Sequence, residues 1–214
     1  MSSYQYELKN VYLGYEFEPS STTVMYYPFK DDQLDKVWGS SIWTTWTKQD
    51  LGYTFNSTSA MTITNPKTTC RFLSMWIKFN SSLSWNNQTA TTYIWWMCYN
   101  FNHNSTTWLQ KFQYHSSASS GDDRWPRSNT VATTTWTWYH MAYWTDGSKV
   151  YAYLNGQKVW ETNITPWLGT ETSMMIWWNL NITLSELICE SSVRDADKVL
   201  SYYNATKSLY WITN

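Results

Sequence analysis

Two tight turns placed a few residues apart constrain the fold of this chain more than any other feature. Residues 138–160 read WYHMAYWTDGSKVYAYLNGQKVW, with alternating strand-like segments around Asp146-Gly147 and Asn155-Gly156. Asp-Gly and Asn-Gly supply the positive φ angles of tight turns whose twist matches that of paired strands. The segment therefore predicts a three-stranded antiparallel meander.

The composition argues against two classes of partner. The chain has 214 residues, 14% charged residues and a net charge of −1. Its length is ordinary for one β-sandwich. Without a basic field to hold a phosphate backbone, nucleic-acid binding is not expected. No apolar run approaches the length of a membrane span, so membrane insertion is not expected either.

Other alternating segments predict a chain dominated by strands. These strands are predicted at residues 11–17, 24–29, 41–47, 51–55, 59–64, 70–79, 91–100, 108–115, 173–178 and 182–189. Residues 70–79 are the strongest case, because one face is wholly apolar and should face the core. That face holds Leu73, Met75, Ile77 and Phe79. Residues 91–100 are apolar on both faces and predict a strand in the centre of a sandwich.

One helix is predicted, at residues 195–203. Asp195 can cap its N-terminus, and Asp197 lies in its first turn, where a carboxylate favours the free backbone N–H groups. A short apolar stripe would pack this helix against the rest of the domain. The stripe consists of Val199, Leu200 and Tyr203.

The three cysteines are odd in number and far apart in the sequence, at Cys70, Cys98 and Cys189. Their spacing matches no metal or redox motif. The favoured interpretation is that they are buried free thiols in or beside strands, and a disulfide is the alternative.

Three blocks, in the right order, resemble the laminin G-like, concanavalin A-like jelly roll. Residues 71–79 are similar to its F-S-h-W-h-K strand, where h is apolar, and residues 138–159 to its central W-x-H-x-A meander. Residues 184–207 are similar to its closing h-S-E-L strand and the helix that follows. The resemblance implies an all-β fold, a two-sheet antiparallel jelly-roll sandwich with one short C-terminal helix. It implies no activity, because lectins, adhesion modules, glucanases and virion proteins share this fold.

The first residues lie outside that match and suggest where the protein works. The segment KNVYLGYEFEP resembles short lead strands that precede jelly-roll modules in tailed-phage virion proteins. We therefore predict an attachment segment at residues 1–20 and one jelly-roll domain at residues 21–214. The N-terminus shows no secretory signal, which agrees with a virion protein released by lysis. The expected location is the virion surface, and an extracellular or cell-surface location is the alternative.

Two non-enzymatic functions fit these features. The first is a virion structural or surface module, such as a capsid decoration, head-fibre or tail-associated protein. Such a module would bind other virion proteins and form a homo-oligomer or stay bound to the particle. The alternative is a carbohydrate-binding lectin or adhesin domain that attaches to glycans on a host surface.

The chain holds 17 tryptophans, which are the main candidates for ligand contacts. Five are expected in strands, as core or sheet-face residues: Trp76, Trp95, Trp136, Trp138 and Trp177. Others lie in polar segments, where an indole face beside hydroxyl and amide groups suits a pyranose ring or a protein partner. These predicted ligand-binding residues are Trp43, Trp46, Trp85 and Trp125.

No catalytic residue is predicted. A glucanase on this scaffold needs two carboxylates about 5 Å apart. The available pairs are Glu16 with Glu18 and Glu186 with Glu190. The first pair lacks a third carboxylate, and Glu186 belongs to the closing-strand block. His140 lies inside the W-x-H motif and is expected to be a satisfied core or turn histidine.

Calcium is the one cofactor that the resemblance brings into consideration, because loop carboxylates and carbonyls hold this ion in the family. Two Asp-rich loops carry the predicted ligands. They are Asp31, Asp32 and Asp35 in the first loop and Asp122 and Asp123 in the second. The favoured interpretation is that both are solvated loops without an ion.

Overall fold

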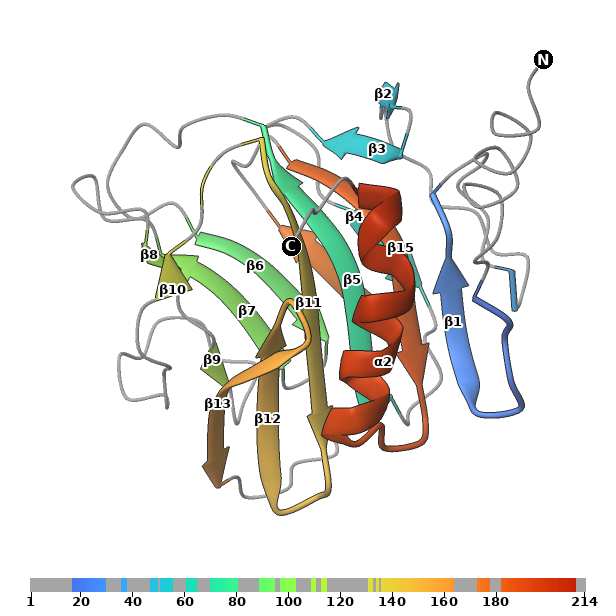
Figure 1. Ribbon diagram of the computed structural model, residues 1–214, viewed down its shortest axis with the longest axis vertical. Helices are drawn as coiled ribbons and strands as arrows, with labels where there is room; N and C mark the ends of the chain where they lie inside the picture. Colours follow the sequence, from blue (N-terminus) through green and yellow to red (C-terminus); the bar gives the residue numbers. More distant parts are fainter. Residues whose placement is uncertain are drawn as a thin grey trace.

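The computed structural model describes residues 17–29, 36–37, 47–49, 51–55, 61–64, 70–80, 89–94, 97–102, 109–110, 113–114, 131–132, 134, 136–163, 173–177 and 182–210. These residues form antiparallel sheets with one α-helix near the C-terminus (Figure 1). This confirms the predicted all-β sandwich with one short C-terminal helix. None of the described helices is long and apolar enough to cross a membrane.

The larger sheet contains eight strands. They are β1 (Thr23–Tyr27), β2 (Thr47–Gln49), β3 (Gly52–Phe55), β5 (Phe72–Phe79), β11 (Trp138–Thr145), β12 (Lys149–Leu154), β13 (Gln157–Asn163) and β15 (Ile182–Glu190). Their order is β13-β12-β11-β5-β15-β3-β2, with β1 paired to β15. Strands β5 and β15, far apart in the sequence, therefore lie side by side in the middle of the sheet.

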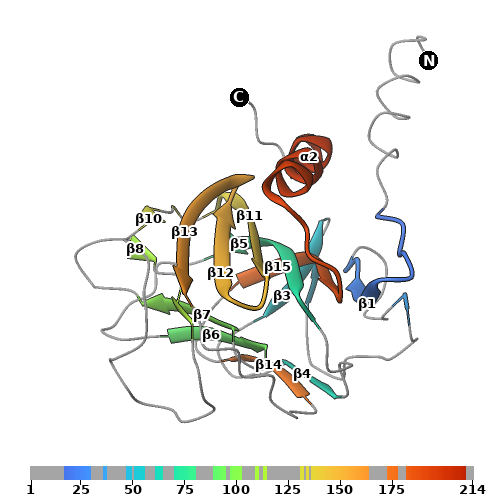
Figure 2. The same ribbon diagram turned by 90° about the horizontal axis from the view of Figure 1, so that it is seen from below.

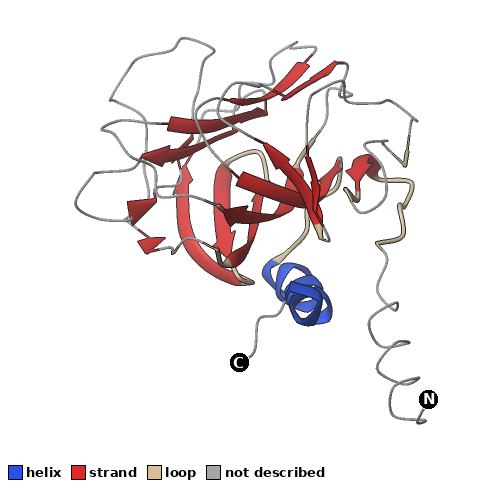
Figure 3. Ribbon diagram, turned by 90° about the horizontal axis from the view of Figure 1, so that it is seen from above, coloured by secondary structure: helices blue, strands red, loops and turns tan. Residues whose placement is uncertain are grey.

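A five-stranded sheet covers one face of the larger sheet, and the helix covers the other (Figures 2 and 3). The smaller sheet contains β4 (Met61–Thr64), β6 (Thr89–Ile94), β7 (Met97–Asn102), β9 (Gln113–Tyr114) and β14 (Ser173–Trp177), in the order β4-β14-β6-β7-β9. A separate pair joins β8 (Leu109–Gln110) to β10 (Val131–Ala132). The helix is α2 (Ala196–Thr206), and a 3-10 turn follows it at Lys207–Tyr210. We call the face of the larger sheet toward the smaller sheet its inner face, and the face toward α2 its outer face.

The inner face forms the largest apolar cluster. The predicted apolar face of β5 lies in it, and Leu73, Met75 and Ile77 are each at most 1% exposed. Tyr139, Met141 and Tyr143 add alternate positions of β11. Because strand side chains point to opposite faces in turn, the intervening residues of both strands face α2. The sequence pattern therefore predicted the inner face correctly.

The meander is confirmed, with one correction at its first turn. Asn155 and Gly156 both have positive φ, 50° and 76°, as a primed two-residue turn requires. At the first turn only Gly147 has positive φ, 94°, and β12 begins at Lys149. Asp146 holds this longer connection together, because its Oδ1 accepts hydrogen bonds from the Ser148 and Lys149 amides, both 2.7 Å.

Two predicted strands are wrong in their extent. Residues 91–100 were predicted as one strand, but β6 and β7 pair antiparallel, with Ile94 opposite Met97. The chain therefore reverses there without a Gly, Pro or Asn signal, and alternation cannot reveal a turn inside an apolar run. Residues 108–115 are divided between two sheets, because β8 pairs with β10 and β9 pairs with β7.

The remaining predicted strands agree with β1, β3, β4, β5, β14 and β15 to within two residues at each end. Strand β2 overlaps the predicted strand 41–47 only at Thr47, and the rest of that segment lies outside the described residues. The predicted strand 11–17 also lies outside them, apart from Phe17. That residue is buried, and its ring lies 4.9 Å from the ring of Tyr26.

The helix begins as predicted. Asp195 accepts a hydrogen bond from the Lys198 amide at 3.0 Å, and Asp197 lies in the first turn. The stripe needs correction, because Val199, Tyr202 and Thr206 are the buried positions, whereas Leu200 and Tyr203 are half-buried. The helix also ends three residues later than predicted, so Thr206 falls inside it.

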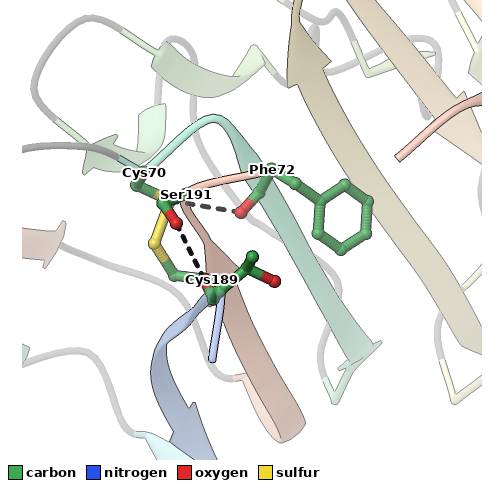
Figure 4. The surroundings of a disulfide bond; sticks show 5 residues. Cys70, Phe72, Cys189 and Ser191 are labelled. Atoms are coloured by element: carbon green, nitrogen blue, oxygen red, sulfur yellow. Dashed lines mark hydrogen bonds between the residues drawn. A yellow bond between two sulfur atoms is a disulfide. The ribbon is translucent and has the colours of Figure 1, made fainter. Parts of the chain in front are cut away.

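Cys70 and Cys189 form a disulfide, so the prediction of free thiols is wrong for these two residues (Figure 4). Both are buried, as predicted. Cys70 lies two residues before β5, and the register of β5 with β15 places Cys189 opposite Leu73. This brings the two Cα atoms to 5.7 Å across a sequence separation of 119 residues. Spacing alone cannot show such a contact, because it depends on which strands pair.

Candidate functional site

The residues predicted to bind a ligand or calcium lie outside the described residues. They are Trp43, Trp46, Trp85, Trp125, Asp31, Asp32, Asp35, Asp122 and Asp123. Their roles therefore stay predictions. Within the described part of the chain, no group of three or more His, Cys, Asp and Glu side chains could hold a metal ion.

The W-x-H-x-A residues of β11 form the docking surface for α2. Trp138, His140 and Ala142 all lie on the outer face. The ring of Trp138 meets Tyr210 edge-on at 5.0 Å, and the ring of His140 lies 5.3 Å from that of Tyr202. Since helix packing buries the three residues, at most 7% exposed, the motif builds the fold rather than an open site.

His140 is a core histidine, as predicted. Its Nε2 shares a 2.7 Å hydrogen bond with Ser74 Oγ, and Nδ1 has no partner among the described residues. Burial lowers the pKa of His140 to about 3. Asn155 of the Asn-Gly turn is bonded to the backbone of His140. Its Oδ1 accepts a hydrogen bond from the His140 backbone N–H, and its own backbone N–H donates to the His140 carbonyl. The imidazole is therefore neutral near pH 7 and sealed from solvent.

Glu186 and Glu190 also bind protein groups. Glu186 accepts a 2.7 Å hydrogen bond from the Tyr202 hydroxyl, and Glu190 pairs with Arg194 through both carboxylate oxygens. Both glutamates are at most 1% exposed. Glu186 has a φ of 51° at the bulge where β15 changes its neighbour from β3 to β1. Neither carboxylate faces an open surface, so this pair gives no support to a hydrolase.

Trp136 corrects the prediction that this residue lies in a strand or on a sheet face. It occupies a turn two residues before β11 and is 68% exposed. It is the only large hydrophobic side chain that is exposed among the described residues. Sequence alternation did not reveal this exposure. Trp136 and Trp138 are two residues apart, and in a longer strand both would point to the same face.

The backbone of Trp136 is also unusual. Its φ is 63°, in the left-handed region that bulky residues seldom adopt. A 2.6 Å hydrogen bond from its amide to the Phe79 carbonyl holds the turn. Its indole makes no hydrogen bond or ring contact with the described residues. Residues held in such sparsely populated backbone conformations cluster at functional sites.

Hydroxyl groups flank this residue in the sequence. Thr134 and Thr137 are both exposed, and their Oγ atoms are 2.9 Å apart. The Thr134 amide donates to the Tyr139 hydroxyl at 2.8 Å, which anchors the segment before Trp136. The surface formed by Thr134, Trp136 and Thr137 is called the Trp136 surface below.

Comparison with known proteins identifies the fold. No protein-family model and no curated protein match the chain. Among solved structures, domain 4 of AbnA, an extracellular GH43 arabinanase from Geobacillus stearothermophilus, superposes with a TM-score of 0.61 and 16% identity. That alignment covers 84% of this chain and 97% of that domain, which was solved with arabinotriose.

Two further structures share the sandwich but are longer. The binding domain of botulinum neurotoxin DC, solved in complex with SialylT, gives a TM-score of 0.65 at 11% identity, over 86% of this chain and 52% of that one. Trypanosoma rangeli sialidase gives 0.60 at 10% identity, over 90% of this chain and 34% of that one. At these identities the likeness shows the β-sandwich fold alone.

Proposed function

We propose that this protein is a non-enzymatic carbohydrate-binding module and that the Trp136 surface is its primary contact with the glycan. One observation carries the proposal: Trp136 keeps a 68% exposed indole on a left-handed backbone. Three other non-glycine residues in the described part of the chain have positive φ, and none of them is an exposed aromatic residue. Phe29 is fully buried, Asn155 forms a tight turn, and Glu186 sits at a bulge.

The chemistry of the surface suits a sugar. An indole face packs against the C–H face of a pyranose or furanose ring, while hydroxyl groups at its edge exchange hydrogen bonds with the sugar hydroxyls. Thr134 and Thr137 supply such hydroxyls on both sides of Trp136 in the sequence. Support also comes from the structures of similar fold that were solved with arabinotriose and with SialylT.

The first test is a glycan-array screen of the purified chain, with the variant Trp136→Gly beside it. Glycine accepts positive φ without strain, so this variant should remain folded, with a stability within about 1 kcal/mol of the wild type. We expect saturable binding by the wild type and at least a roughly tenfold loss of affinity in the variant. Asn204→Ala, an exposed position on α2, serves as the matched control. A folded wild type that binds no glycan would reject the proposal.

A virion structural or surface role is the second candidate, because an exposed tryptophan is also a frequent anchor of protein interfaces. In that role the attachment segment at residues 1–20 would join the particle, and the location would be the virion surface. The Cys70–Cys189 disulfide favours a protein that works in an oxidising environment, outside the cytoplasm. Co-purification with a particle, lost when residues 1–20 are removed, would favour this role over glycan binding.

A further inference from the structure

The meander carries a second cluster of aromatic and polar side chains, on its outer face. The cluster lies toward the Asp146–Gly147 end of β11, whereas Trp136 precedes the opposite end of that strand. At about 3.3 Å per residue, the two ends of β11 are roughly 20 Å apart. A ligand bound at one end can therefore leave the other end free.

An aromatic pair forms one side of this cluster. The rings of Trp144 and Tyr151 stack with their centroids 4.0 Å apart and their planes at 20°. The Trp144 indole N–H donates to the Tyr153 hydroxyl at 3.3 Å, and the Tyr151 hydroxyl donates to Asp146 Oδ2 at 3.0 Å. Both stacked residues are half-buried, so the pair is held in place while part of it remains open to solvent.

A polar hollow of about 300 Å³ lies on the neighbouring strands β12 and β13, lined by Lys149, Glu161, Thr162 and Asn163. The register of β12 and β13 places Lys149 opposite Asn163 and Tyr151 opposite Glu161. Directly opposed residues share a face of the sheet. The Tyr151 ring therefore lies on the same face of the sheet as the charged groups that line the hollow, directly opposite Glu161.

The charges in this cluster are paired. Glu161 accepts hydrogen bonds from Lys158 Nζ at 2.7 Å and from Lys149 Nζ at 3.1 Å. These bonds, that of Lys158 above all, lower the pKa of Glu161, so it stays ionised. Asp146 is ionised too: although desolvation opposes the shift, the amides of Lys149 and Ser148 lower its pKa to about 2. Two ammonium groups and two carboxylates leave the cluster without net charge.

We propose that this hollow is a second glycan subsite and that it takes a neutral sugar. Glu161 would accept hydrogen bonds from sugar hydroxyls, Lys149 and the Asn163 amide would donate to them, and Tyr151 would contact an apolar face of the ring. A carboxylated sugar is disfavoured, because its charge would meet Glu161 and Asp146 as well as the lysines. The inference rests on the proposed carbohydrate-binding function and adds a second site with its ligand class.

The test is an NMR titration of the ¹⁵N-labelled full chain carrying Trp136→Gly, which silences the first surface. The probes are three neutral oligosaccharides (arabinotriose, cellotetraose and maltotetraose) and the anionic 3′-sialyllactose. We expect saturable amide shifts at residues 149–151 and 161–163 with at least one neutral probe. Sialyllactose should bind there at least roughly tenfold more weakly, about 1.4 kcal/mol.

Variants assign these shifts to the hollow. Glu161→Gln keeps the shape of the side chain, and Tyr151→Ala removes the aromatic ring opposite Glu161. Each should weaken neutral-sugar binding roughly tenfold. Gln157→Ala, an exposed position on the same strand, should leave it unchanged. A thermal melt confirms that each variant is folded.

The outcomes separate this inference from the proposed function. If the wild type binds a glycan and Trp136→Gly alone removes every shift, the second subsite is rejected while the proposed function stands. Tighter binding of sialyllactose than of the neutral probes rejects the assigned ligand class. If the wild type binds none of the probes and none of the array glycans, the proposed function itself fails.

Discussion

The two faces of the larger sheet are built on different principles. The inner face is apolar and packs toward the smaller sheet, as Leu73, Met75 and Ile77 of β5 show. On the outer face of the same strand, Ser74 and Trp76 also form side-chain hydrogen bonds. Ser74 pairs with His140, and the Trp76 indole N–H donates to Thr206 Oγ1 at 3.2 Å. Both faces are buried, and the outer face adds these specific hydrogen bonds to its packing.

This difference shows what the sequence blocks that resemble the laminin G-like jelly roll do in this chain. The W-x-H-x-A residues lie beneath α2 with Ser185 and Glu186 of the S-E-L block, whereas Leu187 faces the inner cluster. Ser185 accepts a 2.8 Å hydrogen bond from the Tyr210 hydroxyl. Burial is the main cause that raises the pKa of Tyr202 and of Tyr210, so both keep their hydroxyl protons. These residues therefore form the surface on which the C-terminal helix packs. We expect ligand contacts to come from residues outside W-x-H-x-A and S-E-L.

The largest expected effect compares neighbours on the two faces of β5. Trp76 is fully buried and stacks on Tyr210 with centroids 4.1 Å apart, so Trp76→Ala should cost roughly 3–5 kcal/mol. Hydrogen exchange should show the loss of protection first in α2. Met75→Ala, on the inner face, should instead lower the protection of both sheets together. Equal loss of protection in all elements for both variants would contradict the distinction between the faces.

A smaller effect follows from the buried His140. Its pKa is about 3 in the folded chain and 6.5 in the unfolded chain, so the unfolded state takes up the proton first as the pH falls. The stability that the neutral His140 side chain contributes above pH 6.5 is therefore lost between pH 6.5 and 3. From about pH 7 to about pH 4.5 the loss should reach roughly 2–3 kcal/mol.

Urea unfolding of the wild type and of His140→Gln at the two pH values measures this effect. Glutamine cannot take up a proton, so the variant should lose less stability on acidification than the wild type does. Carboxylates titrate in both proteins and cancel in the difference. An identical pH dependence for the two proteins would show that His140 is not buried as a neutral group.

The smallest effect concerns the two turn glycines of the meander. Both have positive φ, but a Cβ on Gly147 would meet nothing within 4 Å, whereas one on Gly156 would lie 3.0 Å from Leu200 and Tyr203 of α2. Gly147→Ala should therefore cost about 1 kcal/mol, from the backbone alone. Gly156→Ala should cost about 2 kcal/mol, because the helix must also shift. Equal costs in chemical unfolding would mean that α2 does not press on this turn.

Short-range patterns in the sequence predicted much of this fold. The alternation in β5, the Asn-Gly turn and the Asp195 cap each depend on a few neighbouring residues, and all three are present. Features that depend on which distant strands pair were missed. The Cys70–Cys189 bond requires the register of β5 with β15.

The candidate site was less predictable than the fold. Trp136 carries no local signal of its positive φ, and its alternation with Trp138 suggested burial. The Trp144–Tyr151 stack lies across two strands, and the meander places the two residues opposite each other only once its register is set. The predicted loop tryptophans and aspartates lie outside the described residues, so their roles stay predictions.

The central claim is that the exposed Trp136 binds the glycan, whereas the buried Trp138 supports the fold. The most direct test measures glycan affinity and thermal stability together on Trp136→Gly and Trp138→Ala. These tryptophans are two positions apart, yet one is 68% exposed and the other 7%. We expect Trp136→Gly to lose glycan binding and keep its melting temperature. Trp138→Ala should melt several degrees lower, while its folded fraction still binds. If Trp136→Gly binds as the wild type does, or melts like Trp138→Ala, the assignment of binding to the exposed tryptophan is wrong.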